Sequence, residues 1–253
     1  MPMVTLLTDF GLADTYVGQV KAAVLAVAPD ATLVDLPHAV APQDVFGGPL
    51  LLWSAVEPCP AGAVHLAVVD PGVGSARRAV AVRAKRGDVL VGPDNGLLVP
   101  ALRRLGGIDA AVELTRRRFW RATLSTTFHG RDIFGPVAGH LASGVALEQL
   151  GTAIEDLVQL EFPAPHGTQG EVLHIDTYGN LVTNIAADVL PASYRVHIGQ
   201  RVIEPAPNYA AVLPGRLLAI VGTYGLLEVS VREGSAAAEL NAGRGTKVSV
   251  VES

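Results

Sequence analysis

A carboxylate and a guanidinium lie on either side of a glycine-rich turn in the stretch 63–96, AVHLAVVDPGVGSARRAVAVRAKRGDVLVGPDNG. Asp70 ends an apolar run, and Arg77 follows it after Gly72 and Gly74. Such turns bind phosphate when they lead into a helix N-terminus, whose free N–H groups meet the anion. Here an alternating apolar run predicts a second strand instead. We expect the turn to bring Arg77 back onto Asp70, either as a reactive pair or as a structural ion pair.

Two acids follow the first apolar run. Asp9 comes directly after it, and Asp14 stands at the head of the first expected helix. Ligands of open α/β sheets bind beyond the carboxyl ends of the strands, where an acid accepts hydrogen bonds from a ribose diol. A structural role in the turn explains Asp9 as well as ribose binding does. For Asp14 a role as helix N-cap is favoured.

Two further clusters carry polar groups at expected element ends. His129 precedes the expected helix 130–144, where a structural histidine is more common than a catalyst. Tyr178, with the glycine and amide that follow it, suits a planar base, although an ordinary β-turn has the same pattern. Asp9, Asp70 and His129 could hold a metal, but no helical His-x-x-x-His or acidic triad supports this, so no metal is expected.

Composition excludes several classes of protein. The chain has 253 residues, 49% of them hydrophobic, and a net charge of -5, which argues against nucleic acid as a partner. A single cysteine, Cys59, allows no internal disulfide and no cysteine zinc site, and we expect a cytoplasmic protein. No apolar run approaches the ~18 residues of a membrane span.

The first two thirds of the chain alternates strand and helix patterns, which predicts an α/β domain. We expect a mostly parallel, Rossmann-like sheet with helices on both faces. The expected strands cover 3–8, 31–36, 63–70, 79–84 and 88–93, and the expected helices cover 14–30, 43–57, 95–106 and 130–144.

A stretch rich in proline and glycine, residues 161–170, precedes a change of pattern. Beyond it come short runs with strand bias, which predict a small all-β domain, a barrel or a sandwich. We expect domains at 1–163 and 171–253, joined by a linker at 164–170.

Five motifs, in this order, resemble the S-adenosylmethionine hydroxide adenosyltransferase family, relatives of the fluorinating and chlorinating enzymes. They are LLTDFGLADTYVGQVK, VVDPGVGSARRAVAV, VGPDNGLL, TFHGRDIF and IDTYGNLVTNI. The resemblance implies that water attacks the 5′ carbon of S-adenosylmethionine, releasing adenosine and methionine. It assigns catalysis to Asp70, Arg77 and His129 without deciding which acts as base. S-adenosylmethionine is then the substrate, and no cofactor is expected.

The resemblance also implies contacts to the substrate and an assembly. It assigns the ribose to Asp9 and the methionine end to Asp14 and Asp176. It assigns the adenine to Asn180 and the backbone around Glu233, with Tyr178 and Tyr209 as walls around the base. Thr223 and Tyr224 stand where the relatives have asparagine and serine. Family members resemble trimers with sites between subunits. We therefore expect a homotrimer.

Two alternatives to hydrolysis remain. The halogenating relatives have a tyrosine and a hydroxyl residue where this chain has Asp70 and Val73, and a serine at Gly130. A carboxylate 4 Å from a halide repels it by ~4 kcal/mol at an effective dielectric constant near 20, so halide use is not expected. A structural Asp70–Arg77 pair would instead leave a non-catalytic protein that binds S-adenosylmethionine or adenosine.

Overall fold

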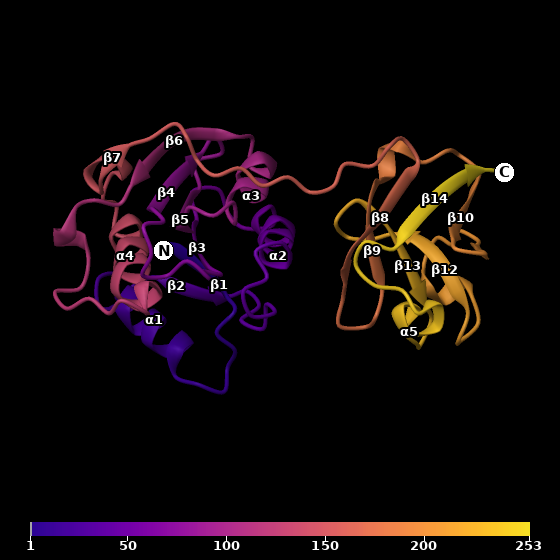
Figure 1. Ribbon diagram of the computed structural model, residues 1–253, viewed down its shortest axis with the longest axis horizontal. Coiled ribbons are helices and arrows are strands. Elements are labelled where there is room, and N and C mark those ends of the chain that lie inside the picture. Colours follow the sequence, from indigo (N-terminus) through magenta and orange to yellow (C-terminus); the bar gives the residue numbers. More distant parts are fainter. Residues whose placement is uncertain (1) are drawn as a thin grey trace. The chain divides into compact units, whose positions relative to one another are not determined.

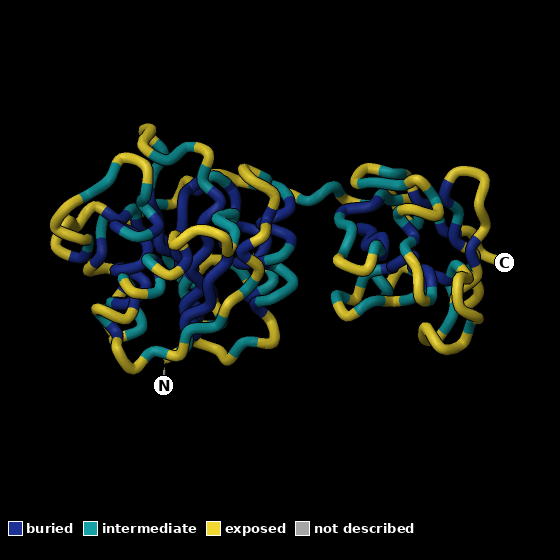
Figure 2. Tube along the Cα trace, turned by 90° about the horizontal axis from the view of Figure 1, so that it is seen from below, coloured by how far each residue is buried: buried dark blue, intermediate teal, exposed yellow. Residues whose placement is uncertain are grey.

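The computed structural model describes residues 2–253, and the chain divides into two compact units, Met1–Leu160 and Glu161–Ser253. Each unit buries its own apolar residues, which appear dark blue in Figure 2. We describe each unit by itself. The boundaries that the sequence predicts at 163 and 171 stay predictions.

Unit 1 consists of one sheet and the helices that cover it (Figure 1). Its strands are β1 (Met3–Thr8), β2 (Thr32–Asp35), β3 (Val64–Val68), β4 (Ala79–Ala84), β5 (Val89–Pro93), β6 (Ile108–Glu113) and β7 (Thr152–Ala153). Its helices are α1 (Tyr16–Leu25), α2 (Gly47–Val56), α3 (Val99–Arg104), α4 (Gly135–Ala142), the short helices η1 (Arg117–Phe119) and η3 (Leu147–Gln149), and the π-helical turn η2 (Gly130–Phe134).

The sheet of unit 1 is mixed, with the strand order β2-β1-β3-β5-β4-β6-β7. The pairs among β2, β1, β3 and β5 are parallel, whereas β4 pairs antiparallel with both β5 and β6, and β6 with β7. The parallel part is therefore smaller than the mostly parallel sheet that the sequence predicts. The reason is the tight turn between β4 and β5, since a parallel pair needs a long crossover.

Alternate residues of each strand point to opposite faces of this sheet. On β1, Val4 and Leu6 join the core under α1 and α4, whereas Leu7 joins the core under α2 and α3. Both faces are thus buried by helices, as the apolar strands predict. This arrangement leaves the carboxyl ends of β1 and β3, at Thr8 and Val68, as places where polar residues can gather.

The helices are shorter than the sequence predicts. α1 begins at Tyr16 with Thr15 at its N-cap, so the expectation that Asp14 caps this helix is wrong. Asp14 lies one residue further out and is exposed. The Gly-Gly-Pro of α2 forms its first turn, where proline is tolerated because the N–H groups there have no helical partner.

Unit 2 is a nearly closed antiparallel sheet. Its strands are β8 (Gln169–Ile175), β9 (Leu181–Ala186), β10 (Tyr194–Ile198), β11 (Arg201–Ile203), β12 (Leu217–Val221), β13 (Leu226–Val231) and β14 (Lys247–Glu252), accompanied by η4 (Ala187–Val189), η5 (Tyr209–Ala211) and α5 (Ala236–Leu240). The order is β11-β10-β14-β8-β9-β13-β12, and a bridge between Pro205 and Ala219 joins the two edges. The predicted barrel-like domain is confirmed. No helix among residues 2–253 is long and apolar enough to cross a membrane.

Candidate active site

Arg77 joins two of the predicted catalytic residues by hydrogen bonds in unit 1. Its Nε–H donates to both carboxylate oxygens of Asp70, at 2.9 and 3.0 Å, and its Nη2 donates to Oδ2 as well. Nη2 also donates to Nδ1 of His129 at 2.9 Å. The side chains of Asp70 and Arg77 are only 5% and 11% exposed, so the pair is largely withdrawn from water. The ring of Phe134 lies 5.2 Å from the guanidinium carbon.

The loop between β3 and β4 is shaped to return Arg77 to Asp70. Gly74 has a φ of +79°, and a Cβ there would stand 2.5 Å from the carbonyl oxygen of Thr126. Ser75 Oγ donates to the Gly72 carbonyl at 2.6 Å and accepts from the Arg77 N–H at 3.2 Å. The glycine is required by both its conformation and the close approach of this loop to the segment that precedes His129.

His129 stands at the N-cap of η2, the π-helical turn that leads into α4. Its neighbour Phe128 packs edge to face with Phe10 and Tyr16, at ring-centroid distances of 5.8 and 5.4 Å. Phe10 follows β1, so these aromatic contacts connect the end of the first strand to the start of α4. π-turns of this kind occur often at functional sites.

The contact with Arg77 determines the proton position on His129. A guanidinium only donates hydrogen bonds, so Nδ1 must carry the lone pair and the neutral ring its proton on Nε2. Burial, and then the Arg77 charge, lower the pKa of His129, while Asp70 and Asp132 act in the opposite direction. His129 is therefore neutral at pH 7, with a donor at Nε2.

The acids after β1 are less enclosed. Oδ2 of Asp9 accepts from the N–H of Gln43 at 2.9 Å, which ties the end of β1 to the segment that precedes α2. Gln43 itself has a φ of +64°. Asp14 is exposed, and the structure shows no contact that would single it out. Asp9 thus keeps a second carboxylate oxygen for a ligand.

In unit 2, Asp176 organises the turn between β8 and β9. Its Oδ1 accepts from the N–H groups of Tyr178 and Asn180 at 2.9 Å, and its Oδ2 accepts from the Asn180 side-chain amide at 2.9 Å. Both oxygens of this carboxylate therefore hold the turn. The same bonds orient Asn180, which is 5% exposed, while leaving Tyr178 79% exposed.

Four of the predicted binding residues line one pocket of unit 2. This pocket has a volume of about 410 Å³ and is lined by Tyr178, Asn180, Tyr209, Val231, Glu233 and Gly234. The Tyr209 hydroxyl donates to Oε1 of Glu228 at 2.7 Å, and burial together with Glu228 raises the pKa of Tyr209 to about 12. Its ring is thereby fixed in the pocket wall. Thr223 and Tyr224 lie in the turn between β12 and β13, and neither lines this pocket.

Several supporting residues were not singled out from the sequence. Phe134 lies against Arg77, Ser75 holds the loop, and Glu228 holds Tyr209. Ser75 has a sequence signal, a hydroxyl two residues before the arginine in a glycine-rich turn. Glu228 has none, because it reads as one residue of an alternating strand.

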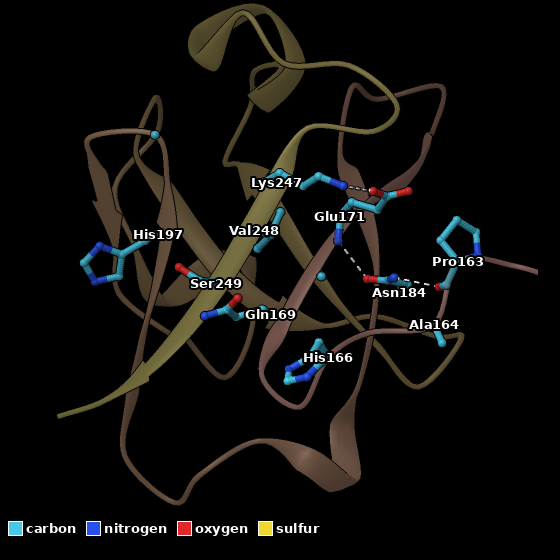
Figure 3. Close-up of a pocket in the computed structure, with 12 residues that line it drawn as sticks. Pro163, Ala164, His166, Gln169, Glu171, Asn184, His197, Lys247, Val248 and Ser249 are labelled. Atoms are coloured by element: carbon cyan, nitrogen blue, oxygen red, sulfur yellow. Dashed lines mark hydrogen bonds and ion pairs between the residues drawn. The ribbon is translucent and has the colours of Figure 1, made fainter.

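A second pocket of unit 2, of about 510 Å³, contains none of the predicted residues (Figure 3). The side-chain amide of Asn184 accepts from the N–H of Glu171 at 2.8 Å and donates to the carbonyl of Pro163 at 2.7 Å. Lys247 pairs with the Glu171 carboxylate. These polar groups are therefore engaged with one another and with the segment that enters the barrel.

Metal binding is the alternative interpretation of Asp9, Asp70 and His129 in the sequence. Within residues 2–253, no group of three or more His, Cys, Asp or Glu side chains has the arrangement of a metal site. Nδ1 of His129 is occupied by Arg77 instead. The expectation of a metal-free site stays a prediction.

Comparison with known proteins places both units in one family. The SAM hydroxide adenosyltransferase N-terminal domain matches residues 4–151, and the C-terminal domain of the same family matches residues 170–249. The chain therefore belongs to the SAM hydroxide adenosyltransferase family, which confirms the resemblance seen in the sequence.

Individual relatives agree with this assignment. A Salinispora arenicola protein named (R)-S-adenosyl-L-methionine hydrolase is 44% identical, over 93% of this chain and 92% of its own. A protein named fluorinase from an Actinoplanes species is 30% identical, over 73% of this chain and 72% of its own. The crystal structure of an uncharacterized conserved protein from Thermotoga maritima matches with a TM-score of 0.92 at 34% identity, covering 98% of this chain and 100% of its own.

Proposed function

We propose that this protein hydrolyses S-adenosyl-L-methionine to adenosine and L-methionine. The observation that carries the proposal is the bridge by Arg77 between a buried carboxylate, Asp70, and a neutral imidazole, His129. The name of the Salinispora relative, a hydrolase, supports it. That name also specifies the (R) form of the substrate, and we propose the same sulfonium epimer for this chain.

The reaction needs a better nucleophile, not a better leaving group, because the sulfonium already departs readily. Water attacks the 5′ carbon, the S–C5′ bond breaks, and its electron pair goes to the methionine sulfur. A carboxylate has about four acceptor positions, so Asp70 can accept a water proton beside its bonds to Arg77. His129 donates from Nε2 to the same water. Asp70 takes the proton that water loses and passes it to solvent.

Positioning of the attacking water supplies the rest of the rate acceleration. A water held in line with the S–C5′ bond reacts as an intramolecular partner, which contributes ~7–11 kcal/mol in ideal cases. The Asp70–Arg77 pair is withdrawn from water, so its two groups keep a fixed direction. We propose that Arg77 orients both Asp70 and His129.

Two groups of residues are proposed to bind the nucleoside. Asp9 offers a carboxylate oxygen to the ribose diol, and the pocket walled by Tyr178 and Tyr209 takes the adenine ring, with Asn180 as its hydrogen-bonding group. A volume of about 410 Å³ falls within the usual range of small-molecule sites. Asp176 is proposed to act on the substrate only through the turn it holds. For Asp14, Thr223 and Tyr224 a substrate role rests on the family resemblance alone.

The direct test is product analysis. Purified protein is incubated with each sulfonium epimer of S-adenosylmethionine, and adenosine and methionine are measured by chromatography. Equal molar release of both products, faster from the (R) epimer, supports the proposal. Incubation with chloride or fluoride as added nucleophile tests the halide alternative, and 5′-halogenated adenosine would contradict hydrolysis as the sole reaction.

One observation favours a second candidate, a non-catalytic binder of S-adenosylmethionine. Both oxygens of Asp70 already accept hydrogen bonds from Arg77, as in a purely structural ion pair.

The pairing of Asp70 with Arg77 also bears on the use of a halide as nucleophile, because it reduces the repulsion that Asp70 alone would exert on a halide. Against halide use, Gly130 offers no side-chain hydroxyl, and a Cβ there would approach Phe10 ring carbons at 3.3 Å.

Replacing Asp9 by asparagine is expected to weaken adenosine binding about tenfold or more. Asparagine keeps one oxygen for the Gln43 N–H but turns an NH₂ toward the diol, so it cannot accept both ribose protons. Titration calorimetry with adenosine and with adenine shows whether the lost contact is to the ribose, since adenine lacks the ribose and its affinity should not change. Equal affinity of both proteins for adenosine would remove Asp9 from the site.

We propose that the chain assembles as a cytoplasmic homotrimer, as the family resemblance implies, with substrate residues of one site contributed by different chains. The resemblance, and the distribution of the predicted residues over both units, support this proposal. Light scattering at working concentration should give three times the 26.3 kDa chain mass. Activity recovered on mixing inactive Asp70→Ala and Asn180→Trp chains would support shared sites, and a monomer would contradict them.

A further inference from the structure

The stretch VGPDNG, residues 91–96, comprises the end of β5 and the turn toward α3, and the turn contains two polar side chains that the proposed chemistry does not use. Asp94 is 8% exposed and Asn95 is half-buried. A buried acid and a half-buried amide in a turn need partners, since burial without hydrogen bonds is costly. Both find them on the loop between β3 and β4 that carries Asp70 and Arg77.

Asn95 holds the start of that loop. Its Nδ2 donates to the carbonyl oxygen of Val69 at 2.8 Å, and Val69 is the residue directly before Asp70. Its Oδ1 accepts from the N–H of Leu97 at 3.2 Å. Because both ends of the amide are engaged, its orientation is fixed, and the carbonyl of Val69 is fixed with it.

Asp94 holds the end of the same loop. Its Oδ2 accepts from Nε and Nη2 of Arg78, at 2.8 and 2.6 Å, and its backbone N–H donates to the Arg78 carbonyl at 3.0 Å. Its Oδ1 accepts from the N–H of Val158 at 2.9 Å, which secures Asp94 from the other side. Arg78 directly follows Arg77.

We propose that Asp94 and Asn95 are positioning residues that hold the two ends of the 69–78 loop and thereby set the separation of the Asp70 carboxylate from the Arg77 guanidinium. This inference rests on the proposed hydrolysis. Adjacent residues of one turn fix the residue before Asp70 and the residue after Arg77, so the glycines between can bend without moving either end. Misplacement by about 1 Å costs ~100-fold in rate, which makes such anchoring matter.

The test uses two variants and a matched control in the full-length protein. Asn95→Leu removes the amide while keeping the number of side-chain heavy atoms and the zero charge. Asp94→Asn keeps an oxygen for Val158 and removes one of the two carboxylate charges that hold Arg78, the other being the exposed Asp156. The control, Gln159→Leu, removes an exposed amide that also donates to a backbone carbonyl, that of Leu157 at 2.9 Å.

Three quantities are measured: kcat and KM for hydrolysis, the pKa of His129 by NMR titration, and the thermal midpoint Tm. Both variants should lower kcat about 100-fold with KM within about twofold. Asp94→Asn should also raise the pKa of His129, because the Arg77 charge moves away while Asp70 and Asp132 remain. Asn95→Leu releases the Asp70 end instead and should lower the pKa of His129, because Asp70 acts to raise it. The control should change neither quantity.

Each alternative outcome is decisive. A lower Tm with unchanged kcat and unchanged His129 pKa would assign Asp94 and Asn95 a purely structural role and overturn the inference. If the wild-type protein released no adenosine while the two variants still shifted the pKa of His129 in these opposite directions, the positioning role would stand and the proposed hydrolysis would fail.

Discussion

Replacing Asp70 by alanine is expected to lower the turnover of S-adenosylmethionine by 10²- to 10⁴-fold, the contribution that a positioned proton acceptor makes. Adenosine affinity should change less than about twofold, because the proposed nucleoside contacts involve other residues. The measurement is product release by chromatography together with calorimetry of adenosine binding. Turnover within tenfold of wild type would show that Asp70 is not the acceptor.

A variant that keeps the fold is needed beside it, because the alanine leaves a nearly buried Arg77 without its partner. Removing one member of a buried pair costs ~3–5 kcal/mol. Asp70→Asn keeps an oxygen acceptor for Arg77 and should fold, as checked by circular dichroism, while losing turnover. Asp109→Ala removes the acid of the exposed Arg83–Asp109 pair and should leave turnover unchanged.

Replacing Gly74 by alanine is expected to reduce both stability and turnover. Its φ of +79° costs an alanine ~1–2 kcal/mol, and the new Cβ would meet the Thr126 carbonyl oxygen at 2.5 Å. Overpacking adds ~1–3 kcal/mol or forces the loop away. Because that segment leads to His129, Arg77 and His129 would separate, and turnover should fall about 100-fold.

Gly62 provides a control with the same backbone conformation. Its φ is +82°, and a Cβ there would meet nothing within 4 Å. Gly62→Ala should therefore lose only the stability that the positive φ costs an alanine, and it should keep full turnover. Urea unfolding and product release are measured for both variants. Equal losses of stability in the two proteins would mean that the contact between Gly74 and Thr126 is not tight.

Secondary-structure elements that depend on neighbouring residues in the chain could be predicted from the sequence. Alternating apolar residues predicted β4 and β5 and the tight turn between them, and buried runs predicted β1 and β3. Element ends were less accurate, as Asp14 shows, because the ends of helices depend on single hydrogen bonds. The segments β6 and β7 were not predicted at all.

The sequence by itself predicted that Arg77 would return to Asp70, because only six residues, two of them glycine, separate the two residues between two strands. The tertiary structure decided that Arg77 also meets His129, 52 residues further on, and that Tyr209 and Glu233 share a pocket with Tyr178. It also decided that both oxygens of Asp176 hold a turn. Contacts between distant segments depend on how the whole core packs, and no local pattern of residues specifies that packing.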